Sequence, residues 1–498
     1  QAVAEAAWQD RDIAAFYRGR NYEPVWTVEG DKHRLRAFLA ALKRAPDHGL
    51  PIRRYDPAEI TATLAAVETD RDRGFAEVAT TKKFLLYARD IRTGVLVPGE
   101  IDPGIVRQVP ALDRLQLLQD FVATAPRGFF RSLPPNDPEY ARLLKEKRIL
   151  QAAIDLGGWG PKIGRGSALR PDGMGGRVIA LRNRLIRMGY LKKSASGVYD
   201  ATLQDAVKRF QHDHGLTADG VAGKSTIAEV NVGPEERMRQ IVVALERRRW
   251  TNQPLGDRHI LVNMADFRAY VMDRGKVTFQ TRTVVGKNTF DRRTPEFSDR
   301  MTHMVINPTW NVPRSIAIKE YLPAFQRNRA AHGYLQLVDG RGNTVDRAHV
   351  DFSQYNEHSF PFDLKQPPSQ SNALGRVKFM FPNKYNIYLH DTPAKSLFSR
   401  EVRAYSHGCV RLHKPFEFAY TLLARQMLDE QTYFRRVLAT RKETVVDLEE
   451  PVPVHLVYRT AWVPAKGRVS YRRDIYGRDA RIFAAMARTG VALRGAES

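Results

Sequence analysis

The chain's single cysteine lies in the segment SHGCVRL at residues 406–412, directly after a histidine and a glycine. A thiol attacks carbonyl groups as the thiolate, and an unperturbed pKa of about 8.5 leaves only a few per cent of it ionised at neutral pH. A nucleophilic Cys409 therefore needs a base close by. The segment indicates covalent catalysis by the thiol, and the alternative is a buried, unreactive cysteine, which is common in protein cores.

Two histidines can supply that base. His407 lies two positions before Cys409, and His390 lies nineteen positions before it. Side chains two apart in an extended segment point to the same face, so His407 can shape the pocket, whereas a histidine on a separate strand can be aimed more freely. We therefore expect His390 to be the base. Gly408 lacks a Cβ, which lets a carbonyl approach backbone N–H groups that could form an oxyanion hole, so the predicted chemistry is acyl transfer.

Strands are the elements expected to position these residues. Apolar residues alternate from Phe379 to Leu389, which predicts a strand over residues 384–389 with His390 at its end. A strand end holds side chains rigidly and still leaves them open to a ligand. After SHGCVRL, Lys414-Pro415 favours the start of a helix, because proline fits the first helical position.

The alternating pattern begins near residue 259 and indicates a β-rich domain. Residues 267–271 and 277–283 alternate on either side of the turn sequence at 273–276, which is the signature of a hairpin. Residues 321–374 are polar and weakly periodic. Such a long stretch within a domain is typical of a lid, a binding loop or a disordered insert.

Helices are predicted for the first part of the chain. Apolar residues recur at helical spacing within residues 1–165. A glycine-rich stretch at 156–176 marks a boundary. A compact unit of three short helices is expected at 177–231, where Asp200 is well placed to cap the second helix.

Two polar clusters in the helical parts are predicted to be solvated surface. His212-Asp213-His214 contains metal-ligand residue types, but two histidines two apart on a helix point in different directions. Glu246-Arg247-Arg248-Arg249 is a short charge run of the kind that usually lies on an exposed helix face. Neither cluster is therefore assigned a function.

The composition describes a globular chain with a strong positive charge. Its 498 residues carry a formal net charge of +24, and 43% of them are hydrophobic, which is enough for ordinary packed cores. The charge favours polyanions such as nucleic acid, an anionic membrane surface or an acidic wall polymer. No apolar stretch approaches the roughly 18 to 20 residues of a membrane span. Because the chain begins with Gln1, an export signal can be neither seen nor excluded.

The motif SHGCVRL, with a histidine upstream, resembles the signature of L,D-transpeptidases with a YkuD-type catalytic domain. The resemblance extends to the large YcbB-like branch through INPTWNVPRSIAIKE, NALGRVKFMFPNKYNIYLHDTP and PVPVHLVYRTAW, and through FYRGRNYEPVW and DHGLPIRRYDP. Within 177–231, the segments LRNRLIRMGYL, VYDATLQDAVKRFQHDHGL and ADGVAGKSTI resemble a peptidoglycan-binding module. An unrelated three-helix packing module is the alternative for this unit.

The resemblance implies an α+β multidomain fold with a helical scaffold, a three-helix peptidoglycan-binding module and a β-rich YkuD-type catalytic domain that carries a capping insert. The expected domains are the scaffold at 1–165, the module at 177–231, a helical linker returning to the scaffold at 232–257, the catalytic domain at 258–430 with the capping insert at 321–374, and C-terminal strands and a helix at 431–498 that complete the scaffold or catalytic domain.

Carried over to this sequence, the resemblance makes Cys409 the nucleophile and His390 its acid–base partner. It makes Ser406, His407 and Gly408 the pocket and oxyanion elements, and Arg411, Tyr388, Asn383 and Trp310 the residues that bind substrate or support the cleft. Arg411 can face a substrate carboxylate or hold the loop through an internal salt bridge. For the two aromatic residues, packing alone is the alternative, and no site residue is assigned within the cap.

The implied reaction joins two peptidoglycan stem peptides. Cys409 would attack the carbonyl of the third, meso-diaminopimelate-type residue, release the terminal D-alanine and leave a thioester, which the side-chain amine of another stem's third residue would resolve. Water as the acceptor would give an L,D-carboxypeptidase, and a lipoprotein amine would give an anchoring enzyme. Neither a metal nor another cofactor is expected.

The expected partners are peptidoglycan stem peptides and glycan, with carbapenem-type β-lactams as covalent inhibitors, in the periplasm of a Gram-negative bacterium. Two readings of other classes stay open. A catalytically idle wall-binding scaffold would have no need of both His390 and Cys409. Nucleic-acid binding is suggested by charge alone, and the sequence contains no recognisable nucleic-acid-binding module. The oligomeric state does not follow from the sequence.

Overall fold

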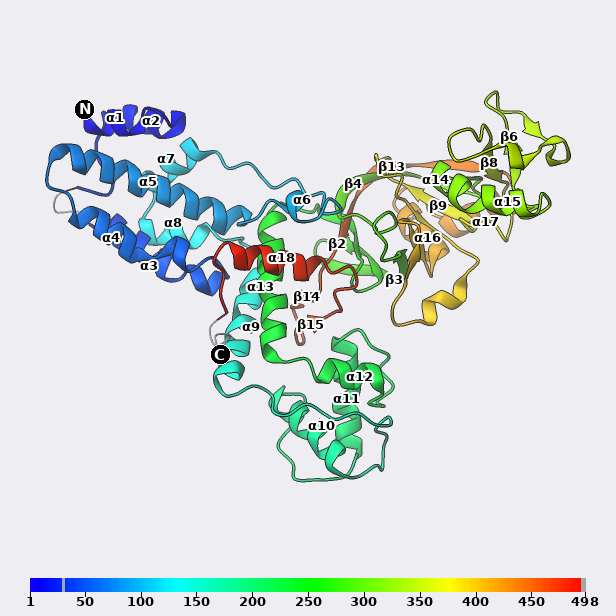
Figure 1. Ribbon diagram of the computed structural model, residues 1–498, viewed down its shortest axis with the longest axis horizontal. Coiled ribbons are helices and arrows are strands. Elements are labelled where there is room, and N and C mark those ends of the chain that lie inside the picture. The colour runs from blue at the N-terminus through cyan, green and yellow to red at the C-terminus, as the bar shows by residue number, and fades with distance from the viewer. Residues whose placement is uncertain (29–31, 494–498) are drawn as a thin grey trace. The chain divides into compact units, whose positions relative to one another are not determined.

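The change from helical to alternating periodicity near residue 259 coincides with a division of the chain into two units (Figure 1). The computed structural model describes residues 1–28 and 32–493. One unit comprises Gln1–Pro254 and Arg459–Ser498 and is mostly helical, and the other comprises Leu255–Tyr458 and is built on a sheet. The predicted α+β architecture is confirmed.

Helix caps and an aromatic core shape the N-terminal part of the first unit. Thr69 and Asp72 form a capping box, in which each side chain accepts the other residue's N–H, and this box starts the long helix α5 (Asp70–Thr93). Phe84 of α5 lies with its ring centre 4.6 Å from that of Phe121 in the core. The other helices of this part are α1 (Ala2–Ala7), α2 (Arg11–Arg18), α3 (His33–Lys43), η1 (Ala45–His48), η2 (Arg53–Tyr55), α4 (Pro57–Ala65), α6 (Pro98–Ile101), α7 (Arg114–Ala123), α8 (Pro126–Ser132) and α9 (Pro138–Asp155).

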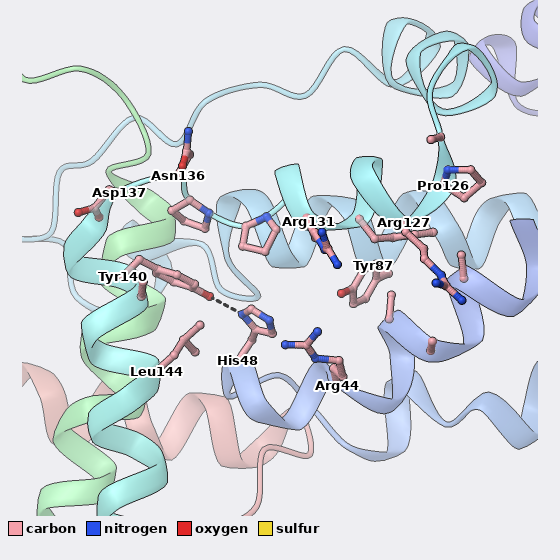
Figure 2. Close-up of a pocket in the computed structure, with 18 of the residues that line it drawn as sticks. Arg44, His48, Tyr87, Pro126, Arg127, Arg131, Asn136, Asp137, Tyr140 and Leu144 are labelled. Carbon is pink, nitrogen blue, oxygen red and sulfur yellow. Dashed lines mark hydrogen bonds between the residues drawn. The ribbon is translucent and has the colours of Figure 1, made fainter.

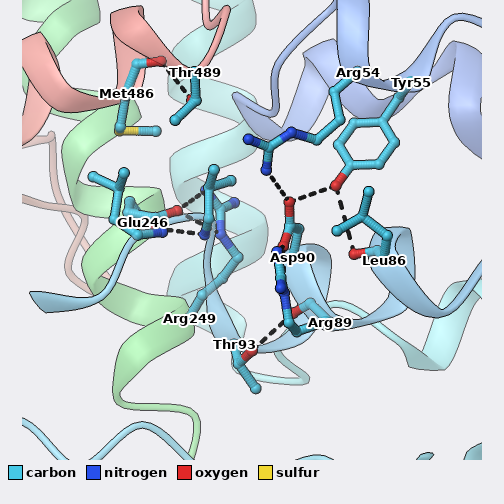
Figure 3. Close-up of polar contacts among 12 residues, drawn as sticks. Arg54, Tyr55, Leu86, Arg89, Asp90, Thr93, Glu246, Arg249, Met486 and Thr489 are labelled. Atoms are coloured by element: carbon cyan, nitrogen blue, oxygen red, sulfur yellow. Dashed lines mark hydrogen bonds and ion pairs between the residues drawn. The ribbon is translucent and has the colours of Figure 1, made fainter. Parts of the chain in front are cut away.

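The predicted solvated face at Glu246-Arg247-Arg248-Arg249 is wrong. The run lies in α13 (Pro234–Trp250), whose residues from Ile241 to Leu245 are all buried, so this helix is surrounded by protein. Glu246 accepts an N–H of Arg249 at 2.6 Å through one oxygen and the N–H of Val95 at 2.7 Å through the other (Figure 3). A four-residue run could not show that its helix has no exposed side.

A second buried carboxylate in the same unit is satisfied in the same way (Figure 3). Asp90 of α5 accepts hydrogen bonds from Arg54 at 2.7 Å, from the Tyr55 hydroxyl at 2.5 Å and from Arg89 at 2.6 Å. Buried charges require such partners because an uncompensated one is costly. Many arginines of this basic chain are therefore internal braces.

The module that follows α9 has the three predicted helices, α10 (Gly176–Arg187), α11 (Ala201–Asp213) and α12 (Lys224–Val230), which lie together in Figure 1. Asp200 caps α11 as predicted, since its side chain accepts the N–H of Leu203 at 2.8 Å. The surface interpretation holds for His212, whereas His214 is buried. His214 lies just past the end of α11, where the chain turns its ring onto Phe210 at a centroid distance of 3.8 Å.

Residues after Tyr458 belong to the first unit. The strands β14 (Ala461–Trp462) and β15 (Ser470–Tyr471) pair antiparallel, and α18 (Arg478–Arg488) packs on α13. The guanidinium of Arg478 is buried and bonds Asp102 at 3.3 Å.

The second unit is a nine-stranded sheet in the order β11-β3-β12-β10-β9-β4-β13-β1-β2. A further pairing of β2 with β3 closes the strands into a ring. The strands are β1 (Arg258–Asn263), β2 (Arg268–Asp273), β3 (Lys276–Gly286), β4 (Phe297–Ile306), β9 (Val377–Met380), β10 (Leu389–His390), β11 (Ala404–Ser406), β12 (Val410–Leu412) and β13 (Thr444–Val457), and the helices are η6 (Lys395–Ser399), α16 (Pro415–Leu423) and α17 (Glu430–Ala439).

Two predicted strand features of this unit have different outcomes. The hairpin around residues 273–276 is confirmed, because β2 and β3 pair antiparallel across it. The strand predicted over residues 384–389 is mostly a turn: β10 contains only Leu389 and His390, and Asn386 has a φ of +52°. The apolar alternation continues through the turn because Ile387 is buried there, so periodicity alone could not locate the strand's start.

The insert between β4 and β9 has a core of its own. Its four-stranded sheet has the order β5-β8-β6-β7, and Trp310, Phe325 and Leu364 pack in the cluster that it covers. The elements are β5 (Trp310–Asn311), α14 (Arg314–Ile316), η3 (Ala317–Tyr321), α15 (Leu322–Arg327), β6 (Gln336–Val338), β7 (Thr344–Val345), η4 (Arg347–His349), η5 (Phe352–Gln354) and β8 (Asp363–Gln366). Of the alternatives that the sequence left open, the disordered insert is wrong.

No helix within the described part of the chain is both long enough and apolar enough to cross a membrane.

Candidate active site

The parallel pairing of β10 with β12 puts a histidine and the cysteine on one face of the sheet. Leu389 pairs with Val410, and His390 pairs with Arg411. Because side chains alternate along a strand, Cys409, two residues before Arg411, faces the same side as His390. Leu389 and Val410 point the other way and are fully buried.

A cavity of about 710 Å³ lies over this face. Most of the residues predicted from the sequence line it, namely Cys409, His390, Ser406, His407, Arg411, Tyr388 and Trp310, whereas Gly408 and Asn383 do not. Seven residues spread over some hundred positions of sequence are thus brought to one cavity. Both parts of the second unit contribute, because Trp310 belongs to the insert.

The loop that carries Cys409 is fixed by three hydrogen bonds. Ser406 Oγ accepts the N–H of Gly408 at 3.2 Å and donates to the carbonyl of Cys409 at 2.5 Å, while the Thr294 hydroxyl donates to the carbonyl of Gly408 at 2.6 Å. Gly408 has a φ of +121°, and a Cβ there would lie 3.1 Å from Ile387, so the position requires glycine. Since the Gly408 N–H is engaged by Ser406, its predicted availability as an oxyanion donor is wrong.

His390 is held in one tautomer. Its Nδ1 lies 2.5 Å from the carbonyl oxygen of Asp391, which can only accept, so Nδ1 carries the hydrogen and the lone pair is on Nε2. Burial, and then the charge of Arg411, lower the pKa of His390 to about 3, although backbone carbonyls oppose this shift. His390 is therefore a neutral imidazole at neutral pH, which is the form that can take up a proton.

The Cys409 thiol is also neutral. Its side chain is partly exposed to the cavity but lies deep among protein atoms, and this burial raises the pKa of Cys409 to about 11. The N–H and hydroxyl of Tyr388 and the charge of Arg411 oppose the shift without cancelling it. The thiol donates to the carbonyl oxygen of Asn386 at 3.4 Å. The site thus contains a thiol and an imidazole rather than a thiolate–imidazolium ion pair.

Arg411 is a cation without a counterion in the cavity wall. The described residues offer its guanidinium no hydrogen bond or ion pair, and its Nε is buried without a partner. Burial lowers the pKa of Arg411. The alternative of an internal salt bridge is therefore wrong. An unpaired guanidinium that faces a cavity is suited to bind an anionic ligand group.

His407 connects the cysteine loop to the insert. Its Nε2 lies 2.7 Å from Oε1 of Glu320 in η3, and Arg292 donates to the same oxygen at 2.7 Å. Burial tends to raise the pKa of Glu320, but the hydrogen bond from His407 and the nearby charges lower it overall, so the carboxylate stays ionised. η3 is a π-helical turn, a feature often found at functional sites.

Asn383 supports the turn before β10 and does not face the cavity. Its amide donates to the carbonyls of Phe381 and Ile387 at 2.6 and 2.7 Å, and its oxygen accepts two N–H groups of the same turn. The assignment of Asn383 to substrate binding is therefore wrong, because its polar atoms are used within the turn. Trp310 lines the cavity while it packs in the core of the insert.

Sequence reasoning missed the lining residues Glu320, Arg292 and Lys378. Glu320 lies within the segment INPTWNVPRSIAIKE that carried the resemblance, but its contact with a histidine 87 positions away follows only from the fold. Within residues 1–28 and 32–493, no group of three or more His, Cys, Asp or Glu side chains is arranged to hold a metal ion.

Three family profiles match separate parts of the chain. Residues 257–436 match "L,D-transpeptidase catalytic domain" (YkuD), residues 11–146 match "Scaffold domain", and residues 174–229 match "Putative peptidoglycan binding domain". A curated relative, described as "Putative L,D-transpeptidase" from Haemophilus influenzae, is 36% identical over 226 residues. The aligned region spans 45% of this chain and 45% of that relative, less than half the length of each.

Two solved structures were also matched. The L,D-transpeptidase from Xylanimonas cellulosilytica is 14% identical, with 60% of this chain and 98% of that chain covered and a TM-score of 0.17. The L,D-transpeptidase from Stackebrandtia nassauensis is 15% identical, with 60% and 97% covered and a TM-score of 0.22.

The three profile matches cover the helical part, the three-helix module and the β-rich unit in that order along the sequence. The cavity with Cys409 and His390 lies within the first-named match. The chain therefore carries the catalytic domain of the L,D-transpeptidase (YkuD) family together with a scaffold domain and a domain of the peptidoglycan-binding type.

Proposed function

We propose that this protein is a peptidoglycan L,D-transpeptidase that cross-links the third residues of two stem peptides through a thioester on Cys409. The observation that carries the proposal is the shared cavity in which Cys409, His390 and the unpaired Arg411 lie on one sheet face. These are a nucleophile, a base and an anion-binding group, which are the parts that acyl transfer to a carboxylate-bearing peptide needs.

His390 acts as general base in the first step. The thiol hydrogen turns from the Asn386 carbonyl to the free Nε2 of His390 as Cys409 Sγ attacks the carbonyl of the third stem residue. The C–S bond forms, and the tetrahedral intermediate carries the negative charge on oxygen. Because both groups are neutral at rest, proton transfer accompanies the attack instead of preceding it.

Collapse of the intermediate breaks the C–N bond to the terminal D-alanine. His390 returns the proton to the departing amine, so the products of this step are free D-alanine and a neutral thioester. We assign the oxyanion contact to the N–H of Cys409 itself, since the Gly408 N–H is engaged by Ser406.

Arg411 is proposed to bind a carboxylate of the donor stem. Its guanidinium faces the cavity next to the nucleophile and lacks an acidic partner among the described residues. Lys378 lines the same cavity, so a second cation is available to an anionic peptide. Such charge-assisted contacts orient the scissile carbonyl as well as adding affinity.

The second half-reaction transfers the acyl group to an amine. His390 takes a proton from the side-chain amine of another stem's third residue, the amine nitrogen attacks the thioester, and the C–S bond breaks to regenerate the Cys409 thiol. Water in place of the amine would make the chain an L,D-carboxypeptidase, and a lipoprotein amine would make it an anchoring enzyme. The acceptor is set by whatever enters between the insert and the sheet face.

The supposed substrate places the enzyme in the cell wall, and we propose the periplasm of a Gram-negative bacterium as its location. The formal net charge of +24 would favour its association with a polymer rich in carboxylates. Carbapenem-type β-lactams are proposed inhibitors, because opening of their ring by Cys409 Sγ would leave a stable acyl-enzyme.

The decisive experiment is mass spectrometry of muropeptides after incubation of isolated sacculi with the purified protein. We expect new cross-links between third residues together with free D-alanine. Cys409→Ala should abolish both products, and His390→Ala should reduce them by about 100-fold or more. His413→Ala removes a nearby histidine that does not line the cavity and serves as the matched control.

Trimmed stems without cross-links would indicate the carboxypeptidase reaction instead. Full activity of Cys409→Ala, or an undiminished carbapenem adduct on that variant, would refute the thioester mechanism.

A further inference from the structure

A second cavity, of about 910 Å³, lies in the helical unit away from any residue discussed as catalytic (Figure 2). Its walls come from α3, η1, α8 and the start of α9, with Tyr87 contributed by α5. The volume is in the upper part of the range of small-ligand pockets, about 300 to 1,000 Å³. No role has been assigned to this cavity so far, and its size alone does not select a ligand.

Two buried side chains offer hydrogens to this cavity, the first of them His48. Arg249 donates to the Tyr140 hydroxyl at 3.0 Å, so that hydroxyl donates in turn to His48 Nδ1, 3.1 Å away. Burial, and then the charges of Arg249 and Arg44, lower the pKa of His48 to about 3, and the ring is neutral. A neutral imidazole that accepts at Nδ1 carries its hydrogen on Nε2. Figure 2 shows that second nitrogen turned away from Tyr140 and toward the cavity.

The second buried donor is Tyr87, whose side chain is only 3% exposed. Figure 2 shows its hydroxyl directed into the cavity, and no hydrogen-bond partner for it exists among the described residues. Burial raises the pKa of Tyr87, so the hydroxyl keeps its hydrogen. A buried hydroxyl without a partner is uncommon in a native fold and points to a ligand atom that accepts from it.

Arginines surround these two donors. Arg44 and Arg131 approach from opposite sides in Figure 2, and Arg36 and Arg127 also line the cavity. Arg36, Arg127 and Arg131 have no acidic partner in the described part of the chain, in contrast to the braced arginines of Figure 3.

The cavity wall holds little negative charge to offset them. Asp137 is the one acidic residue among the described lining residues, and Arg248 already pairs with it. Arg44 has only a long contact of 4.0 Å, to the exposed Asp47. The cavity therefore presents several donors, an excess of positive charge and almost no acceptor, which fits a ligand that carries carboxylates.

We propose that this scaffold cavity binds a stem peptide of the wall polymer through its carboxylates, which gives the enzyme a hold on the polymer outside the catalytic cavity. Ala37, Ala41 and Phe130 supply apolar surface between the arginines, which suits the methyl groups of alanine residues. The inference rests on the proposed function for the identity of the peptide. The donor pattern itself depends only on the residues of the cavity.

Photocrosslinking of the full chain tests the proposal. The probe is a synthetic stem tetrapeptide ending in a meso-diaminopimelate-type residue and D-alanine, with a diazirine on its N-terminus, and the Cys409→Ala variant prevents turnover. Adducts are mapped by peptide mass spectrometry. We expect labelling on α3 or α8 in addition to labelling beside residue 409. A probe with amidated carboxylates should lose the scaffold adducts.

Matched substitutions make the test specific. The Arg44→Gln and Arg131→Gln double variant should lower scaffold labelling by about tenfold or more, with labelling beside residue 409 unchanged. Lys43→Gln removes the same charge from α3 but does not line the cavity, so it should change neither. Tyr87→Phe, which retains the ring, should lower scaffold labelling by a smaller factor.

Three results would overturn the inference: no adducts on α3 or α8, undiminished scaffold labelling in the double variant, or displacement of the probe by peptide-free glycan as effective as by unlabelled peptide. Failure of the proposed function looks different. In that case scaffold adducts would form while adducts beside residue 409 and cross-linked muropeptides would both be missing.

Discussion

At the scale of single residues, the catalytic cavity stores a proton on sulfur. Burial disfavours the charged form of both reacting groups, so it raises the pKa of Cys409 and lowers that of His390. The thiol is consequently protected from ionising until a substrate carbonyl is present. A neutral pair of this kind relies on proton transfer during attack, and the tautomer fixed by Asp391 is the one that permits it.

The free enzyme should therefore react slowly with a simple alkylating agent at neutral pH. Each pH unit below the pKa lowers the thiolate fraction about tenfold, so the alkylation rate of Cys409 by iodoacetamide should rise about a thousandfold from pH 7 to 10 and level off near 11. N-acetylcysteine, which levels off near its own pKa of about 8.5, is the reference. A plateau below pH 8 would show that the resting thiol is already ionised.

Arg411 makes a prediction of its own at this scale. If its guanidinium binds a donor carboxylate, Arg411→Gln should raise KM for a stem tetrapeptide by about tenfold or more and change kcat less. The wild-type enzyme should lose a similar factor when that carboxylate is amidated, whereas the variant should be indifferent to amidation. Equal losses from amidation in both proteins would assign the carboxylate to another residue.

At the scale of elements, the insert and the cysteine loop meet through Glu320. The η3 carboxylate accepts from His407 of the loop and from Arg292 of the segment before β4. The insert has its own apolar cluster, so it can keep its internal structure while its contact with the loop changes. The Glu320 contact is thus suited to control how the insert covers the cavity.

Glu320→Gln tests this coupling. An exposed ion pair contributes up to about 1 kcal/mol, so the substitution should accelerate amide hydrogen exchange over 314–327 by up to about fivefold and change the acylation rate by a similar factor. Glu357→Gln, at an exposed glutamate of the same insert, is the control. Unchanged exchange over 314–327 in the Glu320 variant would remove Glu320 from any control of the insert.

The sequence predicted chemistry better than it predicted element boundaries. SHGCVRL and the upstream histidine identified the reacting pair, because residue types at fixed positions carry that information. Periodicity placed a strand where Asn383 instead holds a turn, since a buried Ile387 within a turn looks like a strand residue. The Glu320–His407 contact and the scaffold cavity join residues distant in sequence, and only the folded chain brings those residues together.

At the scale of the whole molecule, both units contain histidines that are buried in the neutral form. Burial lowers the pKa of His48 and His214 in the first unit and of His259 and His390 in the second. In the unfolded chain each of them would titrate near pH 6.5. Acid therefore acts on both units, in addition to its usual effect on paired carboxylates.

His214 gives the sharpest test of this property. Below about pH 6.5 the unfolded chain binds a proton that the folded chain refuses, so this histidine's contribution to stability is present above that pH and is lost as pH falls toward the lowered folded pKa. The limiting slope is about 1.4 kcal/mol per pH unit. Calorimetry should show the first unit's Tm falling from pH 7.5 to pH 5, and less steeply in His214→Gln. His212→Gln, two residues away on an exposed side chain, should leave the slope unchanged, and equal slopes in all three proteins would contradict the assignment.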